Sequence, residues 1–405
     1  MRTRYFALSA ALAVAMSAQA QKFEGLAMTP TMGWNSWNTF ACDIDEALVK
    51  ETADLFVKLG LKDAGYEYVV MDDCWMEMER DPQTMKLVPD RKKFPNGIKA
   101  VADYVHGKGL KFGMYNCAGT KTCAGYPGTR GYEFLDARQY AEWGVDFLKY
   151  DWCSHSTQDA PSSYSIMRDA IYAAGRPMVF NICEWGDEKS WEWGESVGHS
   201  WRVSGDIARC WDCTENYGGW SKLGLWPIIR LRDGIRKYHG PDHWNDFDML
   251  EVGNGMSAAE DRTHFVMWSM LASPLILGND IRKMSKETLE LVTNKEVIAV
   301  DQDKLGIMGF RFLNDKGFEV WVKPLADGEW AFAFVNMTEQ KRTLNYDWNR
   351  YVKDSLVDRE LKCSEQTYKL RDLLAKKDAG DTRKGLVREV EAHDVVVFRL
   401  TPVKK

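Results

Sequence analysis

Short, β-rich apolar runs alternate with amphipathic stretches between residues 30 and 277 of this 405-residue chain. Near-continuous apolar strands alternating with helices indicate a parallel sheet that is covered on both faces. Eight such units predict a (β/α)₈ TIM barrel, and a doubly wound sheet is the alternative. The expected strands are 30–37, 66–71, 110–115, 145–150, 178–182, 200–203, 243–250 and 274–277, and expected helices include 46–59, 97–106, 132–143, 162–174 and 257–271.

The pattern changes after about residue 305. Residues 318–325, 330–336 and 395–400 are strand-like, and the Asp327-Gly328 pair between the first two is typical of a hairpin turn. Helix is expected here only near residues 370–377. The sequence therefore predicts an α/β barrel over residues 21–305, followed by a C-terminal antiparallel β-sandwich domain over residues 306–405.

The first twenty residues are predicted to be a signal peptide. Arg2 and Arg4 precede an apolar run over residues 5–16, and Ala18-Gln19-Ala20 forms a small-x-small cleavage site. The run is too short to cross a bilayer, and no later segment approaches 18 apolar residues. We therefore expect cleavage near Ala20, export to the periplasm or the medium, and no membrane span.

Composition narrows the class of partner. With 53 Lys and Arg against 59 Asp and Glu, a net charge of −6 gives no reason to expect nucleic acid. The 17 tryptophans hint at carbohydrate, because aromatic faces stack on the C–H faces of sugars, although tryptophan is also core material. The oligomeric state stays open.

Carboxylates follow most of the expected strands, at the barrel face where active sites assemble. Lys149 lies two residues before Asp151, on the same side of its strand, and Arg202 lies four before Asp206. A rim of carboxylates with basic neighbours and an aromatic wall suits cleavage of glycosidic bonds, which needs two carboxyl groups. The carboxylates are Asp72, Asp73, Asp151, Glu184, Asp206, Asp246 and Asp248, and the aromatic residues are Trp34, Trp37, Trp75, Tyr115, Trp152, Trp185 and Trp201.

Each of these residues also has a plainer interpretation. A single Asp at a strand end is more often a helix cap, and Asp246 and Asp248 are the best candidates for a structural role. Cys210 and Cys213 have the CxxC spacing of a zinc half-site, but no second pair accompanies them, so a local disulfide or two separate thiols is favoured. No HxH or HExxH motif occurs. We expect neither a metal nor a cofactor.

Six motifs in sequence order resemble glycoside hydrolase family 27, the retaining α-galactosidases and α-N-acetylgalactosaminidases. They are TPTMGWNSW (29–37), MDDCW (71–75), KTCAG (121–125), KYDWC (149–153), CEWG (183–186) and WRVSGDI (201–207). The resemblance runs from about Leu26 to the C-terminus and implies the same order of barrel and β-domain. It implies α-galactosides as substrates.

The resemblance also implies residue roles. Asp151 matches the catalytic nucleophile and Asp206 the general acid/base of a double displacement. Disulfides are implied for Cys42–Cys74 and Cys123–Cys153. The positions that match substrate-binding residues are Trp37, Asp72, Asp73, Tyr115, Lys149, Glu184, Trp185 and Arg202.

Specificity follows from the same resemblance. Residues 184–186 resemble the galactosidase form of the pocket around the sugar 2-position, where bulk excludes an N-acetyl group. Members that prefer β-L-arabinopyranose depart from the Asp-Asp pair, which is intact here. Galactose is therefore the expected sugar, with β-L-arabinopyranosidase or α-N-acetylgalactosaminidase activity as alternatives within the family. A non-catalytic sugar-binding barrel is the alternative of another class.

Two features depart from the family. Phe247 stands where the family usually has proline, which changes that loop and leaves its effect on the side of the departing group open. Cys183 lacks the partner found in animal members. The pairing of Cys117, Cys183, Cys210, Cys213 and Cys363 is left unassigned by the resemblance, as is the natural substrate.

Overall fold

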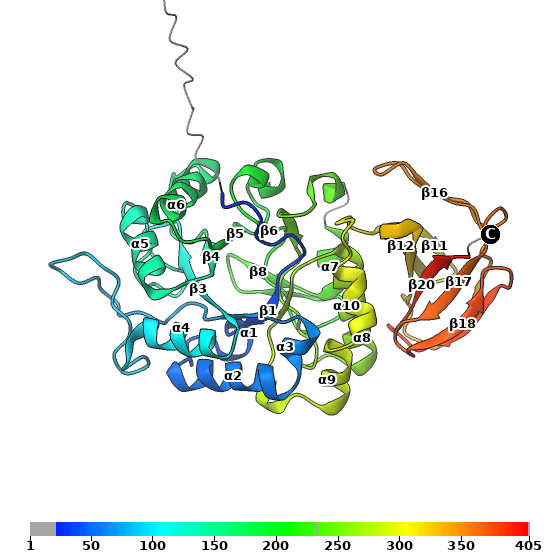
Figure 1. Ribbon diagram of the computed structural model, residues 1–405, viewed down its shortest axis with the longest axis horizontal. Coiled ribbons are helices and arrows are strands. Elements are labelled where there is room, and N and C mark those ends of the chain that lie inside the picture. Colours follow the sequence, from blue (N-terminus) through cyan, green and yellow to red (C-terminus); the bar gives the residue numbers. More distant parts are fainter. Residues whose placement is uncertain (1–21, 232–233, 404–405) are drawn as a thin grey trace, which may run out of the picture.

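The computed structural model describes residues 22–231 and 234–403. Its N-terminal part is built on a sheet of eight parallel strands, at the eight positions expected from the sequence (Figure 1). In sheet order they are β10 (Leu275–Leu277), β1 (Met32–Asn35), β2 (Tyr68–Val70), β3 (Lys111–Cys117), β4 (Phe147–Asp151), β5 (Val179–Cys183), β6 (Ser200–Arg202) and β9 (Trp244–Asp246). The predicted leader, residues 1–20, lies outside the described residues.

The two ends of this sheet are joined through Leu250. Its N–H donates to the Ile276 carbonyl oxygen at 2.7 Å, and its own carbonyl accepts from the Gly278 N–H at 2.9 Å. Leu250 and Leu277 form a parallel bridge. The sheet runs in chain order with no reversal, so the barrel is confirmed over the doubly wound sheet.

Helices surround the barrel (Figure 1). Two of the predicted helices begin at side-chain caps. Asp45 accepts from the Leu48 N–H at the start of α2, and Ser257 with Glu260 forms a capping box at the start of α8. The α-helices are α1 (Trp37–Phe40), α2 (Glu46–Lys58), α3 (Leu61–Ala64), α4 (Gly97–Gly107), α5 (Glu133–Trp143), α6 (Ala160–Ala174), α7 (Leu225–Arg230), α8 (Ala258–Leu271), α9 (Lys286–Val292) and α10 (Lys295–Asp301). Short 3₁₀ turns are η1 (Ser190–Glu192), η2 (Gly194–Ser196), η3 (Ile235–Tyr238), η4 (Ile281–Lys283) and η5 (Ala326–Gly328).

The C-terminal domain is an antiparallel sandwich. Its larger sheet has the order β11 (Phe310–Asp315), β12 (Phe318–Pro324), β13 (Trp330–Asn336), β20 (Val395–Pro402), β17 (Tyr368–Asp372) and β18 (Lys377–Asp381). Two two-stranded antiparallel sheets accompany it, β14 (Arg342–Tyr346) with β19 (Leu386–Val390), and β15 (Val352–Asp354) with β16 (Arg359–Leu361). The helix expected near residues 370–377 is wrong. Burial alternates along β17, with the period of two that pairs it with β20, and the chain then turns into β18.

The two domains share a core. Ala331, Ala333 and Val335 on one face of β13 belong to the hydrophobic cluster of the barrel, whereas Phe332 and Phe334 on the other face belong to the sandwich. The buried Lys323 donates to the carbonyl oxygens of Ser269 and Val300 in the barrel, at 2.9 and 2.6 Å. Figure 1 shows α8 next to the C-terminal sheet, where these contacts are made.

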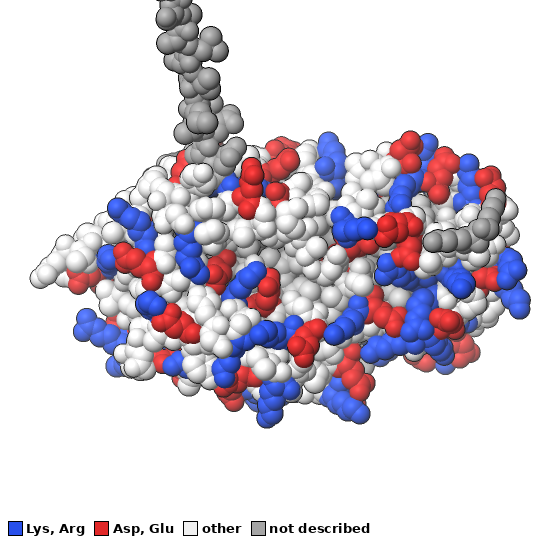
Figure 2. Space-filling model, in the orientation of Figure 1, with Lys and Arg blue, Asp and Glu red and all other residues white. Residues whose placement is uncertain are grey.

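Surface charge and helix length show whether the described residues suit a nucleic-acid or membrane partner. Figure 2 shows basic and acidic side chains interspersed on the face in view. Within the described ranges, no helix has both the length and the apolar character needed to cross a bilayer.

One hairpin lies outside both sheets and was not expected from the sequence. Strands β7 (Thr214–Asn216) and β8 (Ser221–Leu223) pair antiparallel in the part of the chain that connects β6 to β9. Their connection carries two glycines, and Gly218 has a φ of +80°, which an L side chain rarely adopts.

Candidate active site

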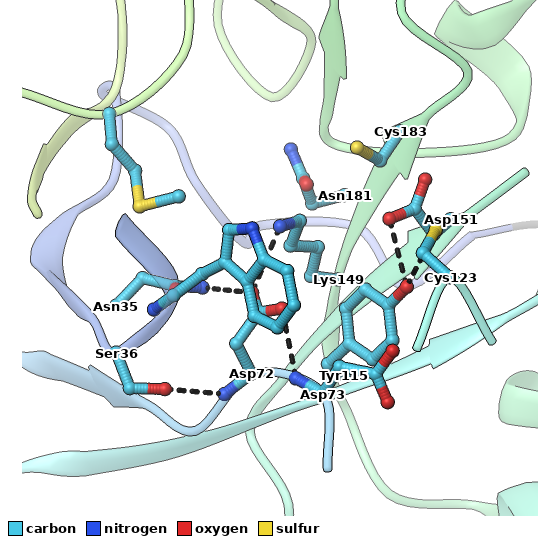
Figure 3. Close-up of polar contacts among 12 residues, drawn as sticks. Asn35, Ser36, Asp72, Asp73, Tyr115, Cys123, Lys149, Asp151, Asn181 and Cys183 are labelled. Atoms are coloured by element: carbon cyan, nitrogen blue, oxygen red, sulfur yellow. Dashed lines mark hydrogen bonds and ion pairs between the residues drawn. The ribbon is translucent and has the colours of Figure 1, made fainter. Parts of the chain in front are cut away.

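The carboxyl ends of the barrel strands open into a cavity of about 640 Å³. Figure 3 shows the polar contacts around part of it. This is the barrel face at which active sites assemble. The cavity is lined by Trp37, Asp72, Asp73, Tyr115, Cys123, Lys149, Asp151, Cys153, Trp185, Asp187, Gly205, Asp206, Gly219, Trp220 and Ser221.

Asp72 and Asp73 follow β2 and are both almost fully buried. The Asp72 Oδ2 atom accepts from the Asn35 amide at 2.8 Å and from Lys149 Nζ at 2.9 Å (Figure 3). Asp73 accepts from the backbone N–H groups of Cys74 and Ala124, at 2.7 and 2.9 Å. These contacts hold two adjacent carboxylates in fixed positions at the cavity.

Lys149 is held between acidic groups. Its ammonium pairs with Asp72 and lies 5.3 Å from the centre of the Tyr115 ring. Burial would lower the pKa of Lys149, but the negative charges of Asp72, Asp151 and Asp206 outweigh it and raise that pKa. The side chain is therefore a permanent cation at the cavity floor.

Asp151 is the last residue of β4, and two donors orient its carboxylate. The Trp152 N–H donates to Oδ1 at 2.9 Å, and the Tyr115 hydroxyl donates to Oδ2 at 2.9 Å (Figure 3). Burial raises the pKa of Asp151 to about 6, against the opposing effect of the Lys149 charge. The carboxyl group is thus fixed in direction and less acidic than an ordinary aspartate.

Asp206 follows β6 and pairs with Arg202 at 3.1 Å. Arg202 also pairs with Asp248 at 2.9 Å, so one buried guanidinium serves two carboxylates. Burial would raise the pKa of Asp206, but the charges of Arg202 and Lys149 outweigh it and lower that pKa. The negative charge of Asp206 also raises the pKa of Asp151. At pH values between the two pKa values, the pair of carboxyl groups therefore holds one proton.

Glu184 and Arg202, both expected to bind substrate, do not line the cavity. Glu184 is fully buried, and its carboxylate accepts from the backbone N–H groups of Gly186, Glu188 and Ser190. It therefore shapes the loop that carries Trp185. The assignment of Glu184 and Arg202 as substrate-binding residues stays a prediction.

The tryptophans expected at the sugar lie at the cavity wall. Trp37 is the first residue of α1, and its backbone N–H donates to the Asn35 Oδ1 atom at 2.8 Å. Trp185 has a φ of +61°, the left-handed region that side chains seldom occupy. The Glu184 contacts with the same loop hold this unfavourable backbone in place, so the position of the Trp185 ring depends on them.

Three disulfides are present. They join Cys42 to Cys74 and Cys123 to Cys153, as the resemblance implies, and Cys210 to Cys213. The CxxC pair is thus a local disulfide, which leaves no thiolate for a metal ion. Cys117, Cys183 and Cys363 are free thiols.

Phe247 faces away from the cavity. Its ring is fully buried and lies 6.2 Å from that of Trp268 in α8. Its N–H donates to the Ser273 hydroxyl at 3.1 Å, a bond that a proline could not make. The departure from the family therefore alters packing between strand and helix layers.

Four residues that line the cavity were not predicted from the sequence. Asp187 comes from the loop after β5, and Gly219, Trp220 and Ser221 come from the β7–β8 hairpin. The Gly218-Gly219 pair between two aromatic residues is a hairpin signal that could have located this segment.

Comparison with protein families matches both domains. Residues 29–303 match the family model described as α-galactosidase A, and residues 315–400 match the α-galactosidase C-terminal β-sandwich domain. The α-galactosidase A of Cellvibrio japonicus (strain Ueda107) is 50% identical over 396 residues, which cover 98% of this chain and 97% of that protein.

Solved structures of glycoside hydrolases have a similar fold. The α-galactosidase from Saccharomyces cerevisiae with raffinose superposes with a TM-score of 0.84 at 31% identity, covering 94% of this chain and 99% of that one. A β-L-arabinopyranosidase from Geobacillus stearothermophilus in complex with arabinose has a TM-score of 0.76 at 26% identity, covering 93% of this chain and 98% of that one.

Proposed function

This chain belongs to the α-galactosidase family of glycoside hydrolases, family 27, and on that premise we propose that it is an exported, retaining exo-α-galactosidase. It would release terminal α-linked galactose from oligosaccharides or polysaccharide side chains. The observation that carries the proposal is the placement of Asp151 and Asp206 in one cavity with the Asp72–Lys149 ion pair at its floor.

In the first step, the Asp151 carboxylate attacks the anomeric carbon while Asp206 protonates the departing glycosidic oxygen. The C–O bond to the leaving group breaks, and a galactosyl ester of Asp151 forms. The Trp152 N–H and the Tyr115 hydroxyl aim the attacking carboxylate. Their hydrogen bonds limit its rotation, so less ordering is needed when the substrate arrives.

In the second step, Asp206 acts as a base. It takes a proton from water, which attacks the anomeric carbon from the face the leaving group vacated. The ester bond breaks, Asp151 is regenerated, and galactose leaves with its α-configuration retained. This chemistry requires the two carboxyl groups to be about 5–5.5 Å apart.

Galactose recognition would fall to the cavity floor. Asp72 and Asp73 accept hydrogen bonds from the 4- and 6-hydroxyls, and Lys149 donates from beside them. Arabinopyranose lacks the hydroxymethyl group, so it would leave part of this buried polar floor unpaired, which costs affinity. Bulk at Trp185 would act against a 2-N-acetyl group.

The test is a comparison of three nitrophenyl substrates: the α-galactoside, the α-N-acetylgalactosaminide and the β-L-arabinopyranoside. We expect the highest kcat/KM for the α-galactoside and slower turnover of the arabinopyranoside. Preference for either of the others would replace the substrate assignment. If folded protein turned over none of the three, the account of a sugar-binding barrel would stand in its place.

The pH dependence follows from the carboxyl pair. The reactive form carries one proton on the pair, whichever group holds it in the free enzyme. As the pH rises through about 6, the upper pKa of the pair, that proton is lost and kcat/KM is expected to fall. Below the lowered pKa of Asp206 both groups become protonated and kcat/KM falls again. A profile of kcat/KM against pH checks this, and a maximum on the alkaline side of pH 8 would contradict it.

Export is proposed from the N-terminal pattern of Arg2, Arg4 and the apolar run that ends before Ala18. The exported protein is expected to begin at Gln21, which its intact mass would reveal. Retention of residues 1–20 in protein recovered outside the cytoplasm would contradict cleavage.

A further inference from the structure

The β7–β8 hairpin carries an aromatic pair at its tip. The Tyr217 and Trp220 rings stack with centres 4.6 Å apart and planes inclined by 15°. Both side chains are exposed, Tyr217 at 52% and Trp220 at 53%, and Trp220 is the only exposed tryptophan within the described ranges. Packing explains a buried tryptophan, but it does not explain this one.

The hairpin is built to hold this pair in place. The Tyr217 N–H donates to the Trp220 carbonyl oxygen at 2.9 Å across the turn, and the Tyr217 hydroxyl donates to Glu215 at 2.8 Å. Ser221 donates to the Asn216 side chain at 2.6 Å. Because Tyr217 lies flat against one face of Trp220, the indole keeps a fixed direction with its other face available.

The base of the hairpin is tied to the segment that bears Asp206. The Leu223 N–H donates to the Asp206 carbonyl oxygen at 2.8 Å, and the Ala208 N–H donates to the Leu223 carbonyl at 2.7 Å. The Cys210–Cys213 disulfide closes the turn between Ala208 and β7, and the Gly224 N–H donates to the Cys213 carbonyl oxygen at 2.8 Å. The aromatic pair is therefore positioned relative to the proposed acid/base, on the side where the departing oxygen is protonated.

Trp220 lines the same cavity as Asp151 and Asp206. We propose that Trp220, backed by Tyr217, is a stacking platform for the sugar ring of the leaving group. The inference rests on the proposed function and deepens it: the preferred substrates are galactosides whose aglycone is itself a sugar. The C–H face of that ring would lie on the indole while the glycosidic oxygen faces Asp206. Because the platform is already ordered, little conformational entropy is lost on binding.

The test compares raffinose, whose leaving group is a sugar, with α-galactosyl fluoride, whose departing fluoride has no ring to stack. In Trp220→Ala, the ratio of kcat/KM for raffinose to kcat/KM for the fluoride is expected to fall about 10-fold. Trp220→Phe keeps an aromatic face and is expected to lose less of this ratio. Tyr351→Ala removes an equally exposed aromatic side chain from the C-terminal domain and should leave the ratio unchanged.

The outcomes separate this inference from the proposed function. If wild-type protein hydrolyses neither substrate, the proposed function fails. If wild type is active and Trp220→Ala loses kcat/KM equally on both substrates, the hairpin only supports Asp206, and the platform is overturned. An unchanged ratio with unchanged activity on both would overturn it as well.

Discussion

Replacing Asp151 with alanine is expected to lower kcat for a nitrophenyl α-galactoside by about 10⁴-fold or more, equivalent to about 5.5 kcal/mol of activation free energy. The variant lacks the group that forms the covalent intermediate, and Asp206 alone cannot replace it. Steady-state kinetics measure the loss. Asp103→Ala is a matched control, because that carboxylate is 58% exposed on α4, outside the cavity, and its removal should leave kcat unchanged.

Azide tests the role of Asp151 more specifically. In Asp151→Ala, azide can occupy the space of the lost carboxylate and attack from the face opposite to the leaving group, so partial rescue is expected with β-galactosyl azide as product. Rescue with the α-azide would place Asp151 in the other role. Turnover near that of the wild type without azide would contradict the assignment of the nucleophile.

Replacing Asp206 with alanine is expected to have an effect that depends on the leaving group. General acid catalysis contributes about 10²–10⁴-fold, so kcat/KM for raffinose should fall by that factor. A dinitrophenolate leaves without protonation, and kcat/KM for its galactoside should fall far less. Kinetics on the two substrates measure the difference.

Azide again separates the roles. In Asp206→Ala, the galactosyl ester on Asp151 still forms, and azide attacks it from the face that the leaving group vacated, which yields the α-azide. Equal loss of kcat/KM on both substrates, with no azide product, would contradict the acid/base role. It would leave Asp206 with the structural task of pairing with Arg202.

The barrel could be predicted because its strands are buried along their length, so most of them are near-continuous apolar runs, and helix-like stretches separate these runs. The helix predicted near residues 370–377 is wrong because three leucines and several charged residues fit a helix as well as a strand there. This segment is a strand because β17 pairs with β20 in the larger sheet, and a contact with a strand so far along the chain leaves no signal in the local sequence. The β7–β8 hairpin was missed because its strands are only three residues long and largely polar.

The candidate site was predictable as a set of residue types, not as a geometry. Strand ends brought Asp72, Lys149, Asp151 and Asp206 together, as parallel strands require. Nothing in the sequence shows that Glu184 turns its carboxylate toward its own loop, since that depends on the backbone path around Gly186. The opposite pKa shifts of Asp151 and Asp206 also depend on burial and on distances to Lys149 and Arg202, which only the fold defines.

Asp151 and Asp206 are proposed to act in a double displacement with retention. Proton NMR during the first minutes of hydrolysis of a nitrophenyl α-galactoside tests it directly, because the anomeric signals of α- and β-galactose are distinct before mutarotation mixes them. We expect the α-galactose signal to appear first and the β-anomer signal to grow in later. If β-galactose were the first product, the reaction would be a single displacement, and the roles given to both carboxylates would be wrong.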